Sequence, residues 1–132
     1  MKSKAIGYWV TTGIVALLIG SGGIMQVMLR PDAVAGIMRL GYPVYFIVLL
    51  GVWKVLGALA ILAPRLPRLK EWAYAGIFFD LTGASVSHLA SGSSAGNVIG
   101  PAVFAVVMLA SWALRPESRR VGALFRAKEA KA

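Results

Sequence analysis

Residues 43–90 have the sequence PVYFIVLLGVWKVLGALAILAPRLPRLKEWAYAGIFFDLTGASVSHLA. Two apolar runs, 43–62 and 72–90, are joined by a short basic loop, and each run carries one charge near its middle, Lys54 in the first and Asp80 in the second. Both charges lie nine residues from the loop, so at about 1.5 Å per helical residue they reach the same depth. The pattern predicts a transmembrane helical hairpin whose two charges meet near the middle of the bilayer.

The rest of the chain extends this hairpin to a membrane bundle. Among its 132 residues 58% are hydrophobic, and the mean hydropathy is +0.75, which is too apolar for an ordinary soluble domain. Two further apolar runs are long enough, or nearly so, to cross a hydrocarbon core about 30 Å thick. We therefore expect an all-α, integral membrane four-helix bundle over residues 1–115, with helices at about 6–29, 43–62, 72–90 and 98–114.

The basic residues predict the orientation of this bundle. Eleven of the fourteen Lys and Arg residues fall at the N-terminus, in the loop of the hairpin or in the segment from Arg115 to the end of the chain, while only Arg30 and Arg39 fall on the opposite side. Because Lys and Arg are retained on the cytoplasmic side of short loops, both termini should be cytoplasmic. The basic tail should contact anionic lipid, and the net charge of +9 is explained by topology rather than by nucleic-acid binding. The first apolar run is too long for a secretory signal and is interpreted as an uncleaved helix.

Two other segments carry structural signals. Residues 31–40 are expected to form a short amphipathic helix on the outer surface. Gly20, Gly22 and Gly23 weaken the first helix, which indicates either close helix packing or a kink that lines a pocket opening outward. Packing is the favoured alternative. In the pocket alternative, Gln26, Ser87 and His88 would supply the polar contacts and are the candidate cofactor-binding residues.

The composition limits the available chemistry. The chain has no cysteine, so it cannot exchange disulfides or hold an iron–sulfur cluster by itself. Its one histidine, His88, does not provide a usual zinc ligand set, and no metal site is expected. The candidate catalytic residues are Lys54, Asp80 and His88. The Lys54–Asp80 pair is either a structural clasp that fixes the register of two helices or a site that binds or transfers protons.

The hairpin resembles the DoxX-like family of small four-helix bacterial membrane proteins. The matching residues are Gly41-Tyr42-Pro43, Trp53-Lys54, Gly57, Pro64, the segment from Lys70 to Gly76, Asp80, Gly83-Ala84 and Ser87-His88. The family takes its name from a small subunit of an archaeal thiosulfate:quinone oxidoreductase, and relatives are linked to membrane oxidoreductase complexes. The resemblance thus implies a multi-pass protein of the bacterial cytoplasmic membrane, and it transfers no established catalytic residue.

Three functions remain open. The first is a redox-associated membrane subunit that holds a quinone or other lipophilic ligand near the Lys/Asp pair, with a redox protein as partner. The second is a non-catalytic scaffold or assembly factor in which the pair only fixes the fold. The third is a small proton-coupled transporter. It is the weaker alternative, because Asp80 could bind and release protons only if Lys54 did not already neutralise it. Exposed small-residue faces favour a homo-oligomer in each case.

Overall fold

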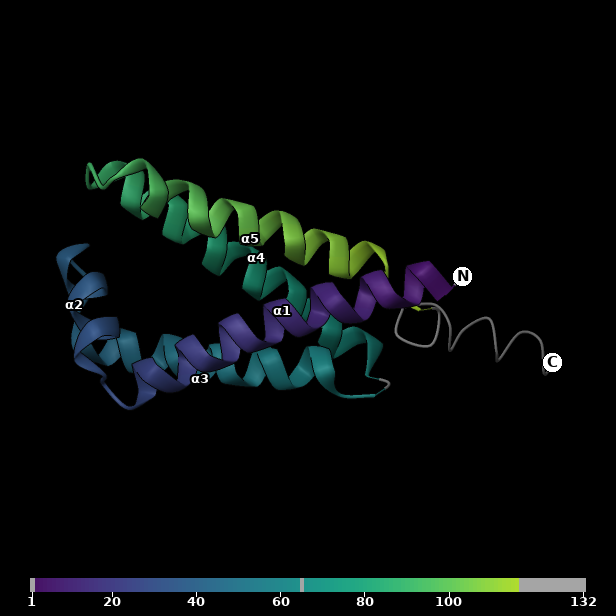
Figure 1. The fold of residues 1–132 in the computed structure, drawn as a ribbon. Helices are drawn as coiled ribbons and strands as arrows, with labels where there is room; N and C mark the ends of the chain where they lie inside the picture. The colour runs from purple at the N-terminus through teal and green to yellow at the C-terminus, as the bar shows by residue number, and fades with distance from the viewer. Residues whose placement is uncertain (1, 65, 117–132) are drawn as a thin grey trace.

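The computed structural model describes residues 2–64 and 66–116, and the described residues fold into helices connected by short turns. The helices, shown in Figure 1, are α1 (Lys2–Val27), α2 (Pro31–Arg39), α3 (Val44–Leu62), α4 (Pro67–Ala90) and α5 (Ala95–Ala113). The expected all-α class is confirmed, and so is the short helix at 31–40. The predicted basic tail falls almost entirely on residues 117–132, outside the described part of the chain.

Three of these helices, α1, α3 and α5, are long and apolar enough to cross a membrane. With 24 residues, α4 is also long enough, but Asp80, His88 and the charges of its first two turns make it more polar than the other three. The chain is therefore an all-helical membrane protein with three spans supported by composition. The fourth span and the cytoplasmic placement of the termini stay predictions.

The long helices form two pairs, α1 with α3 and α4 with α5. Figure 1 shows that the pairs converge at the end where α1 begins and α5 finishes, and diverge toward the end where α2 lies. At the convergent end α1 also contacts α5, and α3 contacts α4, so the bundle is closed there. The short helix α2 packs on α1 and α3 at the divergent end.

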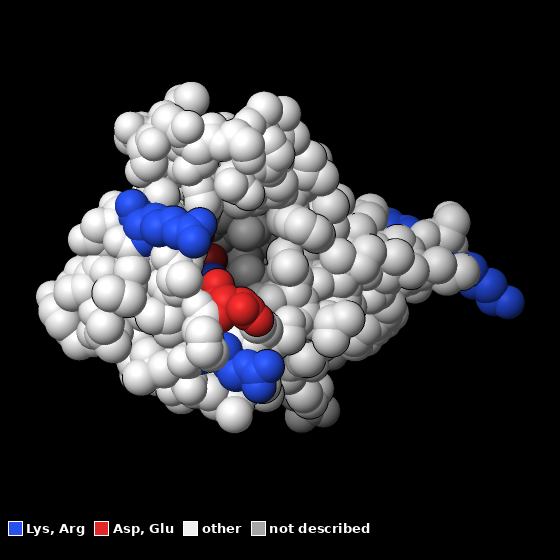
Figure 2. All heavy atoms as spheres, turned by 60° about the vertical axis from the view of Figure 1, so that its left-hand side comes forward, with Lys and Arg blue, Asp and Glu red and all other residues white. Residues whose placement is uncertain are grey.

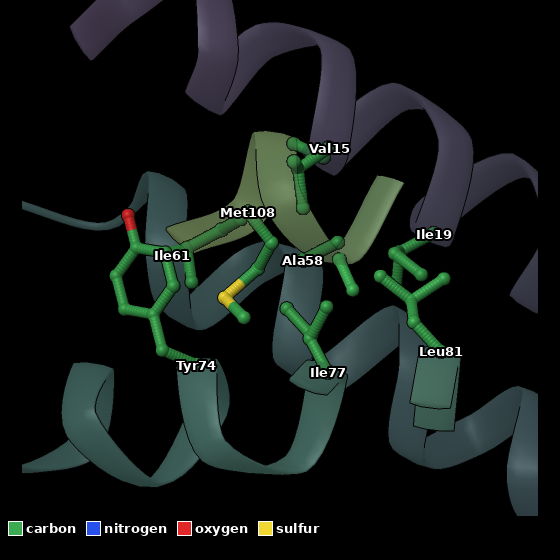
Figure 3. Packing of buried hydrophobic residues seen from close by; sticks show 10 residues of the cluster. Val15, Ile19, Ala58, Ile61, Tyr74, Ile77, Leu81 and Met108 are labelled. Atoms are coloured by element: carbon green, nitrogen blue, oxygen red, sulfur yellow. The ribbon is translucent and has the colours of Figure 1, made fainter. Parts of the chain in front are cut away.

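The apolar core occupies the convergent part of the bundle and receives side chains from all four long helices (Figure 3). Its labelled members are Val15, Ile19, Ala58, Ile61, Tyr74, Ile77, Leu81 and Met108. Val15 and Ile61 are fully buried, and such side chains lose their contacts with lipid and water alike. The core ends at Ile19 on α1 and at Leu81 on α4, where the two pairs begin to separate.

Two glycines bring the backbones of α1 and α3 into direct contact. A Cβ atom added at Gly23 would lie 2.8 Å from the carbonyl oxygen of Gly51, and one added at Gly51 would lie 2.7 Å from the carbonyl oxygen of Gly23. Helix α1 runs unbroken through this region. Close packing, the favoured alternative for the glycine-rich segment, is therefore what the structure shows at Gly23.

Buried polar groups join the helices at the convergent end. The Ser111 hydroxyl on α5 lies 2.6 Å from the Thr12 hydroxyl on α1 and 2.8 Å from the Tyr74 hydroxyl on α4. Thr12 and Ser111 have no exposed surface, so each hydroxyl depends on the others for its hydrogen bonds. This three-hydroxyl cluster connects three helices and closes the bundle from within.

Ionic groups seal the same end further out. Lys70, which the orientation argument placed in the loop, belongs to the first turn of α4 and is completely buried. Its ammonium donates to the carbonyl oxygens of Ala60 and Ala63 at the end of α3, where a cation is favoured by the helix dipole.

The expected start of α4 at residue 72 is too late, because Pro67 at the first helical position starts the helix before the apolar run begins.

Replacing Ser111 with alanine should destabilise the bundle. The change leaves the Thr12 and Tyr74 hydroxyls without their shared buried partner, so we expect the unfolding free energy in detergent micelles to fall by about 1–3 kcal/mol. The control is Ser21→Ala, because the Ser21 hydroxyl is exposed and bonds to its own helix. It should change stability by less than about 0.5 kcal/mol. Equal effects of the two substitutions would contradict the role given to the three-hydroxyl cluster.

Candidate functional site

The Lys54–Asp80 pair predicted from the hairpin is present in the structure. The Lys54 Nζ atom on α3 lies 3.6 Å from Asp80 Oδ2 on α4, and the two side chains retain 17% and 14% of their exposed surface. A close charge-assisted hydrogen bond would measure about 2.7–2.9 Å, so this is a looser ion pair. It links one helix pair to the other at the level where the apolar core ends.

Beyond the ion pair, toward α2, the bundle opens. Figure 2 views the molecule from this divergent end and shows a hollow between the helices, with acidic and basic side chains at its mouth. We call this space the central hollow. Polar groups in such a space can contact a bound molecule, whereas those at the convergent end are enclosed by packing.

Each long helix places a polar residue on the continuation of its core-facing stripe. These residues lie one, two or three helical turns beyond a core residue of the same helix, at spacings of four, seven or eleven. The core residues are Ile19, Ala58, Leu81 and Met108, and the corresponding polar residues are Gln26, Lys54, His88 and Asn97. Of these four polar residues, Gln26 is buried, Lys54 and His88 are partly buried and Asn97 is exposed.

Gln26 is the most buried of these polar residues. It keeps 5% of its exposed surface, and its Oε1 atom accepts no hydrogen bond from the described part of the chain. The turn of α1 that carries it packs against Gly51, since a Cβ at Gly51 would lie 2.9 Å from the Gln26 Cβ. Gln26 is thus a buried acceptor beside the helix that carries Lys54.

The other two candidate ligand residues have protein partners. The Ser87 hydroxyl lies 2.7 Å from the hydroxyl of Tyr42, which precedes α3, so this contact connects α4 with the opposite helix pair. The His88 Nδ1 atom lies 3.1 Å from the hydroxyl of Ser93 in the α4–α5 turn. The structure thus brings Lys54 and Asp80 together, and it gives Ser87 and His88 separate contacts nearer the mouth of the central hollow.

The groove observed beside the glycine segment is not lined by the polar residues predicted for an outward pocket. A shallow apolar groove does run between α1 and α3 past Gly20 and Ser21, with Ala58 at its base. Its lining includes none of Gln26, Ser87 and His88, because those residues lie on other faces of α1 and α4. The association of these three side chains in a ligand pocket stays a prediction.

Tyr42 and Asn97 were not selected as site residues from the sequence. Asn97 follows the core stripe of α5 in the same way that Gln26 follows that of α1, so extending each stripe beyond the core would have identified it. Tyr42 belongs to the segment that resembles the DoxX-like family, but its contact with Ser87 spans 45 residues and depends on the tertiary fold. Within the described ranges, no three His, Asp or Glu side chains are close enough to hold a metal ion.

The chain matches one protein family over most of its length. A sequence model with the description DoxX-like family matches residues 10–111, which include α2, α3, α4 and most of α1 and α5. The match covers the central hollow and the ion pair. No curated protein and no solved structure matches the chain.

Proposed function

This chain belongs to the DoxX-like family, and from that premise we propose that it is a redox-associated membrane subunit that holds a quinone or another lipophilic molecule beside Lys54 and Asp80. The observation that carries the proposal is the position of the ion pair at the end of the core, where Lys54 and Asp80 keep 17% and 14% of their exposed surface and so stay partly accessible. A purely structural pair would be expected inside the packed region, where the surrounding helices hold both partners.

The groups around the hollow suit the polar head of such a molecule. Lys54 carries three N–H donors, and the loose contact with Asp80 leaves donors for a carbonyl oxygen. The apolar core adjoins the ion pair, since the core residue Leu81 follows Asp80 on α4, and apolar surroundings suit a ring attached to a hydrocarbon chain. When bound, a quinone would supply electron and proton acceptance, while the chain's own part is to bind and orient the ring.

The membrane arrangement is part of the same proposal. Helix α4 crosses the bilayer as the fourth span, because it pairs with α5 and supplies core residues at the same depth as the three apolar spans. The termini lie in the cytoplasm of a bacterium, as the distribution of basic residues predicts, and the central hollow then opens on the opposite side. The basic segment 116–132 contacts anionic lipid.

A scaffold or assembly role is the second candidate. It is favoured by the fact that the ion pair joins α3 to α4 and so connects the two helix pairs. In that case the pair fixes the fold, and the hollow holds ordinary lipid. A proton-coupled transporter would require Asp80 to gain and lose a proton freely, which a neighbouring ammonium at 3.6 Å opposes.

Mass analysis of retained lipophilic molecules distinguishes these roles. The full chain is purified into lipid nanodiscs, and its bound molecules are compared with those of Asp80→Asn. We expect a quinone in the natural protein and at least a tenfold smaller amount in Asp80→Asn, since loss of the carboxylate removes the partner that positions Lys54. The control is Glu71→Gln, which removes the partner of Arg115 at the convergent end and should leave the quinone in place. Absence of any specific molecule from all three samples would favour the scaffold.

A further inference from the structure

Each of the two helix pairs is held together along the divergent half of the bundle. In the first pair, Gly23 on α1 and Gly51 on α3 bring the helix backbones into contact. In the second pair, the Ser85 hydroxyl on α4 donates to the Val98 carbonyl oxygen on α5 over 2.8 Å. Because such contacts resist separation within a pair, we expect each pair to move as one body.

The contacts between the pairs change in kind along the bundle. At the convergent end the pairs share the apolar core and the three-hydroxyl cluster. The core ends at Leu81 on α4, and Ser87 lies six residues further on, about 9 Å along the helix. There the Ser87 hydroxyl lies 2.7 Å from the hydroxyl of Tyr42, which precedes α3 in the opposite pair. A contact this far beyond the core bears directly on how widely the pairs stand apart.

The Tyr42 side chain is positioned for this contact by its own helix pair. Its ring stacks on that of Phe46 on α3, with the ring centroids 5.0 Å apart and an angle of 19° between the planes. Gly41, which precedes Tyr42, has a φ of +94°, in the left-handed region that glycine adopts readily. This turn directs the chain from α2 into α3. The hydroxyl that reaches α4 therefore belongs to a ring that is fixed on α3.

We infer that the Tyr42–Ser87 hydrogen bond is a latch that limits how far the two helix pairs separate at the mouth of the central hollow. Tyr42 keeps 37% of its exposed surface, so water can replace the Ser87 hydroxyl when the bond breaks. A hydrogen bond that exchanges with water shifts an equilibrium by about fivefold. The bond thus favours the arrangement in which it is formed, and it can break while the core stays packed. The inference goes beyond the proposed function, because it concerns the bundle without a ligand.

Distances between spin labels measure this separation directly, because the chain has no cysteine and two can be introduced at chosen positions. At the divergent end, Met28→Cys after α1 and Leu89→Cys on α4 place one label on each pair, and both side chains are exposed. At the convergent end, Ile6→Cys on α1 and Trp72→Cys on α4 form the matched control pair, also at exposed positions. Electron–electron double resonance gives the distance distribution for each label pair in the full chain in nanodiscs.

Loss of the Tyr42 hydroxyl should widen the divergent end alone. We expect Tyr42→Phe, which keeps the ring, to raise the ratio of long to short Met28–Leu89 label distances about fivefold. Ser87→Ala should have the same effect, and the double variant should add nothing further, since all three variants lose the same bond. The control is Tyr45→Phe, because the Tyr45 side chain is 74% exposed, and it should leave the distribution unchanged.

Two results would overturn the inference. An unchanged or shortened Met28–Leu89 distance in both Tyr42→Phe and Ser87→Ala would mean that the bond does not limit the separation of the pairs. An equal change of the Ile6–Trp72 distances would mean that the bundle loosens throughout and that the bond serves the fold as a whole. Either result leaves the proposed function standing, since retention of a lipophilic molecule is measured separately.

Discussion

Lys54→Met and Asp80→Asn should each destabilise the protein strongly, while the double variant Lys54→Met/Asp80→Asn should recover most of the loss. Removing one partner of a fully buried pair leaves an uncompensated charge and costs about 3–5 kcal/mol. Because these side chains keep 17% and 14% of their exposed surface, we expect the lower end of that range, about 3 kcal/mol for each single variant. Unfolding in mixed detergent micelles, monitored by tryptophan fluorescence, measures all three.

The same set of variants separates stability from ligand binding. Recovery of stability without recovery of quinone in the double variant would show that the pair does more than hold the helices together. Recovery of both would show that the charges are only a clasp and would refute the proposed site. Additive losses in the double variant would mean that the two residues do not interact energetically, in conflict with the 3.6 Å contact.

Gly51→Ala is expected to produce the second large effect. The new methyl group would lie 2.7 Å from the Gly23 carbonyl oxygen and 2.9 Å from the Gln26 Cβ, so α1 and α3 would have to move apart. Overpacking of this kind costs about 1–3 kcal/mol, and we expect about 3 because the obstructing atoms include rigid backbone. The measurement is the unfolding free energy in the same micelles.

Gly22 on α1, which does not face α3, supplies the control for this change. A Cβ at Gly22 would meet no atom within 4 Å, although Gly22 is adjacent to Gly23. Alanine there relieves the low helix propensity of glycine and should leave stability unchanged or raise it by up to about 1 kcal/mol. If Gly22→Ala and Gly51→Ala lower the unfolding free energy equally, alanine is harmful at either position. The loss would then not be explained by contact between α1 and α3.

The helices and the ion pair could be predicted because their signals are local. Apolar runs of spanning length mark α1, α3 and α5, and the equal distances of Lys54 and Asp80 from one loop bring their charges together. The first residues of the helices are harder to predict from sequence. The charged first turns of α4 lie outside its apolar run, so a prediction that follows hydropathy begins the helix at residue 72 instead of Pro67.

The remaining contacts depend on how the helix pairs lie relative to one another. Thr12 and Ser111 are 99 residues apart, and nothing near either residue indicates the other. From the sequence, Lys70 is expected in a basic loop. In the structure it is buried against the end of α3, because the chain turns at Leu66 and α4 starts at Pro67. The openness of the central hollow likewise results from the angle between the pairs, which is a tertiary property.

The difference between the two ends of the bundle has a consequence for how a partner enzyme would approach. One end is blocked by Lys70 and the three-hydroxyl cluster, whereas the other is open around α2. If a molecule held beside Lys54 enters from the open end, a protein that delivers it or exchanges electrons with it would dock beside α2. Assembly and access would then compete at this short helix.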